Sequence, residues 1–187
     1  MANHLTEFMR YTAPDAHALA QGIARQREQL ALAVQAGAAL ATVDHAADLA
    51  ALLTTDRREQ EALPLLREHA DAADALPHEE AAGWFWNAYA TALQCAGQRD
   101  EADRCFAKTL RLARAGGWQR LQALALHHWG RSLVEQGRLA DARARIAEAL
   151  DIRTQLGDAR GQASSQKALD TLAELQADVQ HNEHGER

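Results

Sequence analysis

LQCAGQRDEADRCFAKTL, residues 93–110, and LVEQGRLADARARIAEAL, residues 133–150, decide the fold because they repeat one pattern 40 positions apart. Each stretch reads as the end of one helix, a turn that contains glycine, and a second helix that begins near an acidic residue. Within that second helix, a small alanine precedes a large apolar residue by four positions. The pattern predicts two antiparallel helices joined by a turn, and its recurrence predicts a repeated helical hairpin.

The same register of 40 residues extends toward the N-terminus. The positions that share it are Ala62, Ala102 and Ala142; Leu53, Leu93 and Leu133; Leu66, Phe106 and Ile146; and Leu49, Tyr89 and Trp129. Each hairpin leaves apolar surface on both sides, so neighbouring hairpins must stack. We therefore expect an all-α protein, a right-handed superhelical solenoid of about three antiparallel hairpins with N-terminal and C-terminal capping helices.

Composition excludes several classes of function. The 187 residues suffice for one domain, and the net charge of −6 argues against a nucleic-acid partner, which calls for a basic surface. The chain begins without the features of a signal peptide and has no uninterrupted apolar run long enough to span a membrane. Only Cys95 and Cys105 are present, without the spacing of a metal or redox motif. These observations predict a soluble cytoplasmic protein with reduced cysteines and no membrane partner.

The repeats resemble the tetratricopeptide repeat (TPR). The second copy supplies Trp86, Tyr89, Ala90, Leu93, Gly97, Ala102, Phe106 and Leu110 at the large, small and turn positions of that family. The third copy supplies Leu126, Trp129, Gly130, Leu133, Gly137, Ala142, Ile146, Ala149 and Leu150. The resemblance covers residues 43–175 and implies the binding of a protein or peptide.

Two features of the sequence depart from the TPR pattern. The family repeats about every 34 residues, whereas this chain repeats every 40 residues and looks like the longer repeats of bacterial regulatory and signalling proteins. In the first copy, Arg57 stands where the turn glycine is expected and His69 stands at a usually small site. The first copy is therefore degenerate.

The aromatic stretch GWFWNAY, residues 83–89, divides by helical angle. Trp86 and Tyr89 share the face that packs inside the hairpin, and Phe85 lies on a second face that meets a neighbouring helix. Trp84 lies on a third face, which lines the groove in TPR proteins. Only Trp84 is therefore a candidate for contact with a ligand.

Polar residues occupy this third face in successive copies. The candidate groove residues are Trp84, Asn87, Thr91, Gln94, His127, Arg131 and Lys167. We hypothesise that this strip binds a segment of a partner protein, with Asn87 bonding its backbone and Arg131 and Lys167 meeting a carboxylate. The alternative is that these side chains are solvated and have no dedicated ligand.

Neither a metal site nor a catalytic site is evident. His127 and His128 point about 100° apart on a helix, so they cannot hold one ion together. The HEEAA stretch from His78 lacks the second histidine of HExxH, while His181 and His184 fall in a polar tail. The chain has no GxSxG, no phosphate-binding loop and no dinucleotide fingerprint. We expect no enzymatic activity, no cofactor and no metal.

The predicted organisation has four parts: an N-terminal segment over 1–14, a helix over 15–42, the repeat domain over 43–177, and a flexible tail over 178–187. Pro14 and Asp15 suit a helix start, and Leu19, Ile23, Leu30 and Val34 then form an apolar stripe. The first helix either caps the solenoid or forms a homodimer through this stripe.

Two classes of function follow from these patterns. One is a TPR adaptor or regulator that binds a segment of a partner protein. The other is a module that senses a peptide or small ligand and relays its binding to an effector protein.

Overall fold

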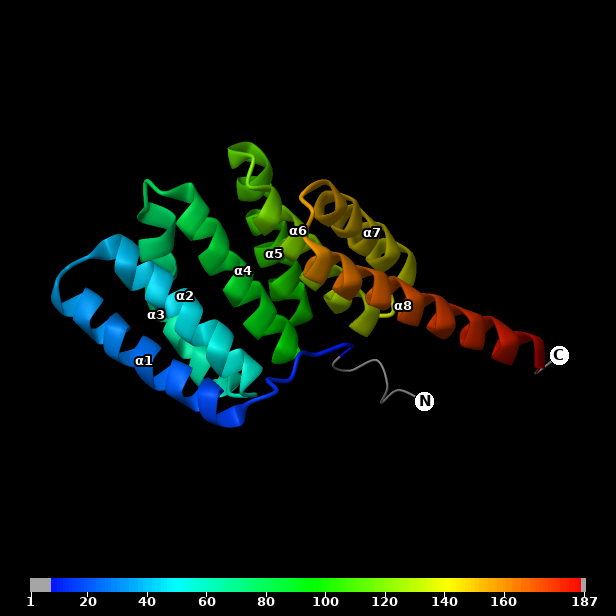
Figure 1. Ribbon diagram of the computed structural model, residues 1–187, viewed down its shortest axis with the longest axis horizontal. Helices are drawn as coiled ribbons and strands as arrows, with labels where there is room; N and C mark the ends of the chain where they lie inside the picture. Colours follow the sequence, from blue (N-terminus) through cyan, green and yellow to red (C-terminus); the bar gives the residue numbers. More distant parts are fainter. Residues whose placement is uncertain (1–7, 186–187) are drawn as a thin grey trace. The chain divides into compact units, whose positions relative to one another are not determined.

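Short links join the helices of this protein. A computed structural model describes the backbone of residues 8–185 and the side chains of residues 8–177. These residues form eight helices and no strand, which confirms the all-α prediction (Figure 1). The helices are α1 (Ala16–Gln35), α2 (Ala39–Thr55), α3 (Glu59–Ala75), α4 (Glu79–Cys95), α5 (Arg99–Gly116), α6 (Gln119–Glu135), α7 (Leu139–Gln155) and α8 (Ala159–Gly185). None of them is long and apolar enough to cross a membrane, as far as the described residues go.

The helices follow a step of 20 residues, half of the repeat seen in the sequence. From α2 onward, the start of each helix lies 20 positions before the start of the next. Five of them, α2, α3, α4, α6 and α7, have 17 residues, so a link of three residues completes the step. The pairs α2–α3, α4–α5 and α6–α7 are the three predicted hairpins, and α1 and α8 flank them.

One type of turn ends most of these helices. At the end of α4, the Gly97 N–H donates to Gln94 O over 3.0 Å and the Gln98 N–H donates to Leu93 O over 2.9 Å. Gly97 has a φ of +79°, the left-handed conformation that this closure requires. Positive φ recurs at the matching positions Gly37, Arg57, Gly117, Gly137 and Gly157.

The link between α3 and α4 is built differently. It contains Pro77, and the preceding Leu76 is extended, with φ −67° and ψ 133°. A residue before proline is pushed out of the helical region by contact with the proline ring, so the helix ends there without a left-handed residue. The 20-residue step is nevertheless kept.

The core of the second hairpin contains three of the four aromatics of GWFWNAY. Phe85, Trp86 and Tyr89 are 0%, 8% and 5% exposed, which confirms their predicted burial. The rings of Trp86 and Tyr89 stack with 5.6 Å between centroids. The Trp86 Nε1–H donates to Asp74 over 2.9 Å, while Lys108 Nζ lies 3.5 Å from the Trp86 ring centroid. This stretch is therefore core with a polar edge rather than an open aromatic box.

Backbone contacts divide the chain into two compact units. The N-terminal unit comprises residues 10–121, and the C-terminal unit comprises residues 122–185 together with Phe8 and Met9, as far as the described residues go. The boundary lies within α6. The boundaries of the predicted domains stay predictions.

The segment predicted as one N-terminal helix contains a helix and the start of another. The Asp15 side chain caps α1 by accepting from the Ala18 N–H over 2.9 Å, as the sequence indicated. The helix ends at Gln35, and α2 already begins at Ala39. Within the predicted stripe, Ile23 and Leu30 are buried, whereas Val34 is 53% exposed. Since α1 packs on α2, it covers part of the first hairpin, and the homodimer stays a prediction.

The last helix extends further than the sequence suggested. Residues 178–185, predicted as part of a flexible tail, belong to α8, whose helical bonds continue to Gly185. The side chains of His181 and His184 lie outside the described residues.

Arg57 offers a test of the turn. A left-handed conformation costs a residue with a Cβ roughly 1–2 kcal/mol, and glycine avoids this cost. Glycine also gives the unfolded chain more conformational freedom, which offsets part of the gain in stability. We expect Arg57→Gly to raise the free energy of unfolding by about 1 kcal/mol, measured by urea denaturation. Arg57→Ala removes the same side-chain contacts but keeps the Cβ, so it should bring no such gain. Equal stabilities of the two variants would contradict this account.

Candidate functional site

The seven predicted groove residues lie on three helices and in both units. Trp84, Asn87, Thr91 and Gln94 are on α4 in the N-terminal unit, and His127, Arg131 and Lys167 are on α6 and α8 in the C-terminal unit. The structure therefore presents two faces, which we call the α4 face and the α6–α8 face.

On the α4 face an exposed aromatic lies one turn from a buried amide. Trp84 is 37% exposed, in contrast to the three buried aromatics beside it, while Asn87 is only 5% exposed. The Asn87 carboxamide oxygen receives no hydrogen bond from any residue that the structure describes. Thr91 donates its hydroxyl to the Asn87 main-chain oxygen over 2.9 Å, and Gln94 is 1% exposed. Asn87 and Gln94 are thus more deeply buried than solvated groove residues would be.

The neighbouring helix α2 packs beside α4 and carries small residues at the matching positions. The residues 40 positions before Trp84, Asn87, Thr91 and Gln94 are Asp44, Ala47, Ala51 and Thr54. Ala47 is buried at 7% exposure and Thr54 is buried with its hydroxyl bonded to Ala50 O over 2.8 Å. Partial burial, followed by repulsion from Asp48, raises the pKa of Asp44. Asn87 thus replaces an alanine of the repeat with a polar group.

The α6–α8 face contains a buried polar network that the groove hypothesis did not foresee. His127 and Arg131, 5% and 7% exposed, are joined by Arg153 at 6% and Ser165 at 0%. Arg153 Nη1 donates to Ser165 Oγ over 2.7 Å and to Gly161 O over 3.0 Å. Ser165 Oγ also lies 3.2 Å from His127 Nδ1. Since Arg153 can only donate, the serine hydroxyl accepts from it and has its own hydrogen available for a neutral His127.

The charges around His127 keep its ring neutral. Burial, followed by the positive charges of Arg153 and Arg131, lowers the pKa of His127 to about 3. Burial also lowers the pKa of His128 far below its usual range, with Arg131 adding to the effect. Neither ring is therefore a cation at neutral pH.

Arg131 binds a distant part of the chain rather than an empty groove. Its Nε–H donates to the main-chain oxygen of Phe8 over 2.9 Å, across a sequence separation of 123 residues. Lys167, in contrast, is exposed on α8. The structure thus buries both His127 and Arg131 and leaves Lys167 on the surface.

Three residues of these faces escaped the sequence analysis: Arg153, Ser165 and Phe8. A signal existed for Arg153, because the residues 40 and 80 positions earlier are Ala113 and Ala73, both fully buried. An arginine at a buried alanine position marks a local change in the packing. No such register exists for Phe8, which precedes the repeats.

Other chemistry-bearing groups do not form a site. The described residues contain no group of three or more His, Cys, Asp or Glu side chains that could hold a metal ion. Burial, followed by the charge of Glu101, raises the pKa of the Cys105 thiol to about 11, so this thiol is protonated and unreactive at neutral pH. A surface hollow at the α4–α5 turn, lined by residues 97–101 and Arg104, includes neither Trp84 nor Asn87.

Comparisons with known proteins identify the fold only. No protein-family model matches the sequence, and no curated protein matches it. The crystal structure of BtubC (BKLC) from P. vanneervenii is similar, with a TM-score of 0.71 and 20% identity over 87% of this chain and 68% of BtubC. A de novo designed helical repeat protein, DHR81, has 16% identity over 88% of this chain and 92% of its own, with a TM-score of 0.48. The chain has a helical repeat fold, and at 20% identity the likeness to BtubC carries no function.

The low pKa of His127 predicts acid sensitivity. Its pKa is about 3 in the folded protein and about 6.5 when unfolded, so protons bind the unfolded chain more tightly. The stability due to the neutral ring is complete above pH 6.5 and is lost as the pH falls toward 3. Between pH 7 and pH 5 the free energy of unfolding should fall by about 2 kcal/mol through this group.

Urea denaturation at pH 7, 6 and 5 measures this slope for the wild type and for His127→Gln. The amide of glutamine can keep a hydrogen bond to Ser165 but does not titrate, so the variant should lose less stability on acidification. Equal losses in the two proteins would show that His127 is not the responsible group.

Proposed function

We propose that this chain is a non-enzymatic TPR module that binds a segment of a partner protein on its α4 face. The observation that carries the proposal is the buried Asn87 carboxamide oxygen, which has no hydrogen-bond donor among the described residues. A buried acceptor without a partner costs about 1–3 kcal/mol. Because this oxygen is buried in the free protein, a main-chain N–H of a bound segment would remove that cost once the carboxamide turns toward the surface.

Trp84 supplies the second element of the proposed contact. It is one turn from Asn87 on the same helix and 37% exposed. A tryptophan ring provides a large contact area at a small entropic cost, which is why this residue is frequent among those that dominate binding energy. A partner segment that covers Trp84 would bury its ring and bring main-chain groups toward Asn87.

The register of the repeat supports a binding role for Asn87. The equivalent position in the first copy is Ala47, which is buried at 7% exposure. Since alanine satisfies the packing there, the fold does not need an amide at this position. A polar group that folding does not require is better explained by a ligand.

The exposed ring of Trp84 fits contact with a protein segment better than the enclosure of a small molecule. Small ligands are usually held in concave pockets that enclose most of their surface. The proposal therefore favours a partner segment over the sensing of a small ligand. We also propose a bacterial source, on composition and repeat type, and a cytoplasmic location.

Affinity capture from a bacterial lysate tests the proposal with four proteins: wild type, Trp84→Ala, Asn87→Ala, and Leu156→Ala as control. Leu156, at the α7–α8 link, is 38% exposed and so matches Trp84 in exposure. We expect at least one protein to be retained by wild type and control and reduced about tenfold or more, equivalent to about 1.4 kcal/mol, by each α4 variant. Retention that is equal in all four would exclude the α4 face.

The stability of Asn87→Ala provides an independent readout. Because the oxygen has no donor in the free protein, its removal should leave the melting temperature unchanged or raise it. Loss of partner retention without loss of stability is the expected result. A large drop in melting temperature would mean that Asn87 is part of the folded framework instead.

A further inference from the structure

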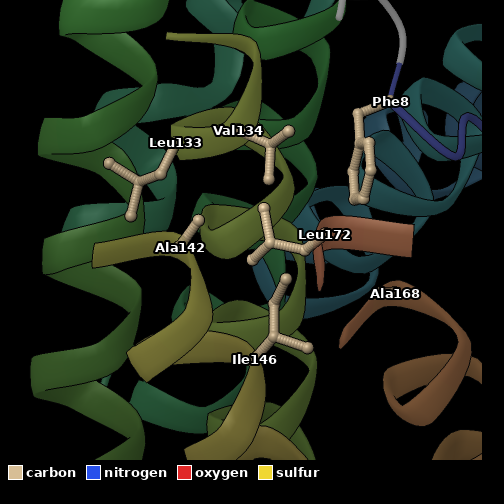
Figure 2. Close-up of a cluster of buried hydrophobic side chains, with 7 residues drawn as sticks. All are labelled: Phe8, Leu133, Val134, Ala142, Ile146, Ala168 and Leu172. Atoms are coloured by element: carbon tan, nitrogen blue, oxygen red, sulfur yellow. The ribbon is translucent and has the colours of Figure 1, made fainter. Parts of the chain in front are cut away.

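A segment from the chain's beginning fills an apolar seat in the C-terminal unit. Phe8 lies outside the helices yet is only 4% exposed. Its side chain belongs to a buried cluster, the Phe8 seat, formed by Leu133, Val134, Ala142, Ile146, Ala168 and Leu172. Figure 2 shows the ring facing the side chains of Val134 and Leu172. Three helices, α6, α7 and α8, thus contribute to the seat of one side chain.

A hydrogen bond to the main chain accompanies this apolar contact. Arg131 Nε donates to the Phe8 carbonyl oxygen over 2.9 Å, and the arginine itself is 7% exposed. Proteins that bind extended segments of other proteins use the same combination, with main-chain bonds for affinity and a pocket for a side chain for specificity. The contact therefore has the form of a bound peptide.

The repeat positions that line the seat are buried in both units. Leu133, Ala142 and Ile146 belong to the 40-residue register, and their equivalents Leu93, Ala102 and Phe106 are fully buried in the N-terminal unit. Phe8 has no equivalent in the earlier copies. It is an addition to the repeat, held over a separation of 123 residues from Arg131.

The backbone immediately after Phe8 adopts a conformation that is unfavourable for its residue. Met9 has a φ of +49°, in the left-handed region that disfavours a residue with a Cβ. Its side chain packs against the same cluster. Release of the segment would relieve this conformation, which favours exchange with another segment.

We propose that the Phe8 seat is a peptide-binding site that the chain's own N-terminal segment occupies. The ligand from outside this chain is an extended segment of a partner protein, and that segment contains an aromatic residue. That aromatic side chain replaces Phe8, and the main-chain carbonyl of the same residue accepts from Arg131. The inference goes beyond the α4 face, because every residue of this seat lies in the C-terminal unit.

The test uses the full chain and a fluorescent peptide of residues 1–12. Phe8→Ala empties the seat, whereas Ile23→Ala removes a side chain of 3% exposure from α1 in the N-terminal unit and leaves the seat filled. A site that the chain itself occupies has an apparent affinity for added peptide that is reduced to the fraction of molecules in which the site is open. The peptide should therefore bind Phe8→Ala at least tenfold more tightly than wild type or Ile23→Ala. Fluorescence anisotropy measures the affinities, and a peptide with alanine in place of Phe8 should not bind.

Three results would overturn the proposal. One is the absence of saturable binding to Phe8→Ala up to about 1 mM peptide, the weak end of specific binding. Another is equal affinity for all three proteins. The third is a dimeric wild type with a monomeric Phe8→Ala in size exclusion with light scattering, which would assign the seat to the N-terminal segment of a second copy.

A second measurement applies if circular dichroism shows that Phe8→Ala does not fold. Methyl NMR signals of Val134 and Leu172 are then followed in the wild type as excess peptide is added. They should shift with the Phe8-containing peptide and stay unchanged with its alanine version. No shift in either titration overturns the proposal, and a failed capture experiment on the α4 face does not affect it.

Discussion

The hydrogen bond from Gln98 N–H back to Leu93 O is the interaction on which the rest of this structure depends. It closes the helix in a left-handed turn, and the same closure recurs at most links. The turn fixes the helix at 17 residues and the link at three, so that matching residues recur every 40 positions. Leu93 and Leu133 can therefore be buried in the same way. A shift of one residue in any link would rotate the next helix by about 100° and move its apolar face away from the core.

Much of the fold could be predicted because matching residues recur every 40 positions in the sequence. Ala102 and Phe106 are fully buried, as their positions in the repeat indicated. Two features could not be read from the sequence. The turn at Gly37 separates α1 from α2 within the segment over 15–42, and high helix propensity on both sides left the bounds of the two helices open. The division within α6 has no counterpart in the repeat pattern.

Only part of the candidate site could be predicted, because the prediction relied on helical angle alone. The angle places Asn87 and Arg131 on a common face but does not say what covers that face. Arg131 is covered by the segment that contains Phe8, and a contact over 123 residues has no signal in a local pattern. Trp84 was correctly separated from Phe85, Trp86 and Tyr89, because for adjacent aromatics the angle decides which ones enter the core.

Departures from the repeat are more informative than the repeat itself. Asn87 and Arg153 both stand where an equivalent copy has a buried alanine, so neither is required for packing. Arg153 donates hydrogen bonds to Ser165 and Gly161, and these bonds offset the energetic cost of burying its guanidinium. The Asn87 oxygen has no such compensation among the described residues. Of two polar groups at the same kind of position, the one that folding leaves unsatisfied is the better candidate for recognition of another molecule.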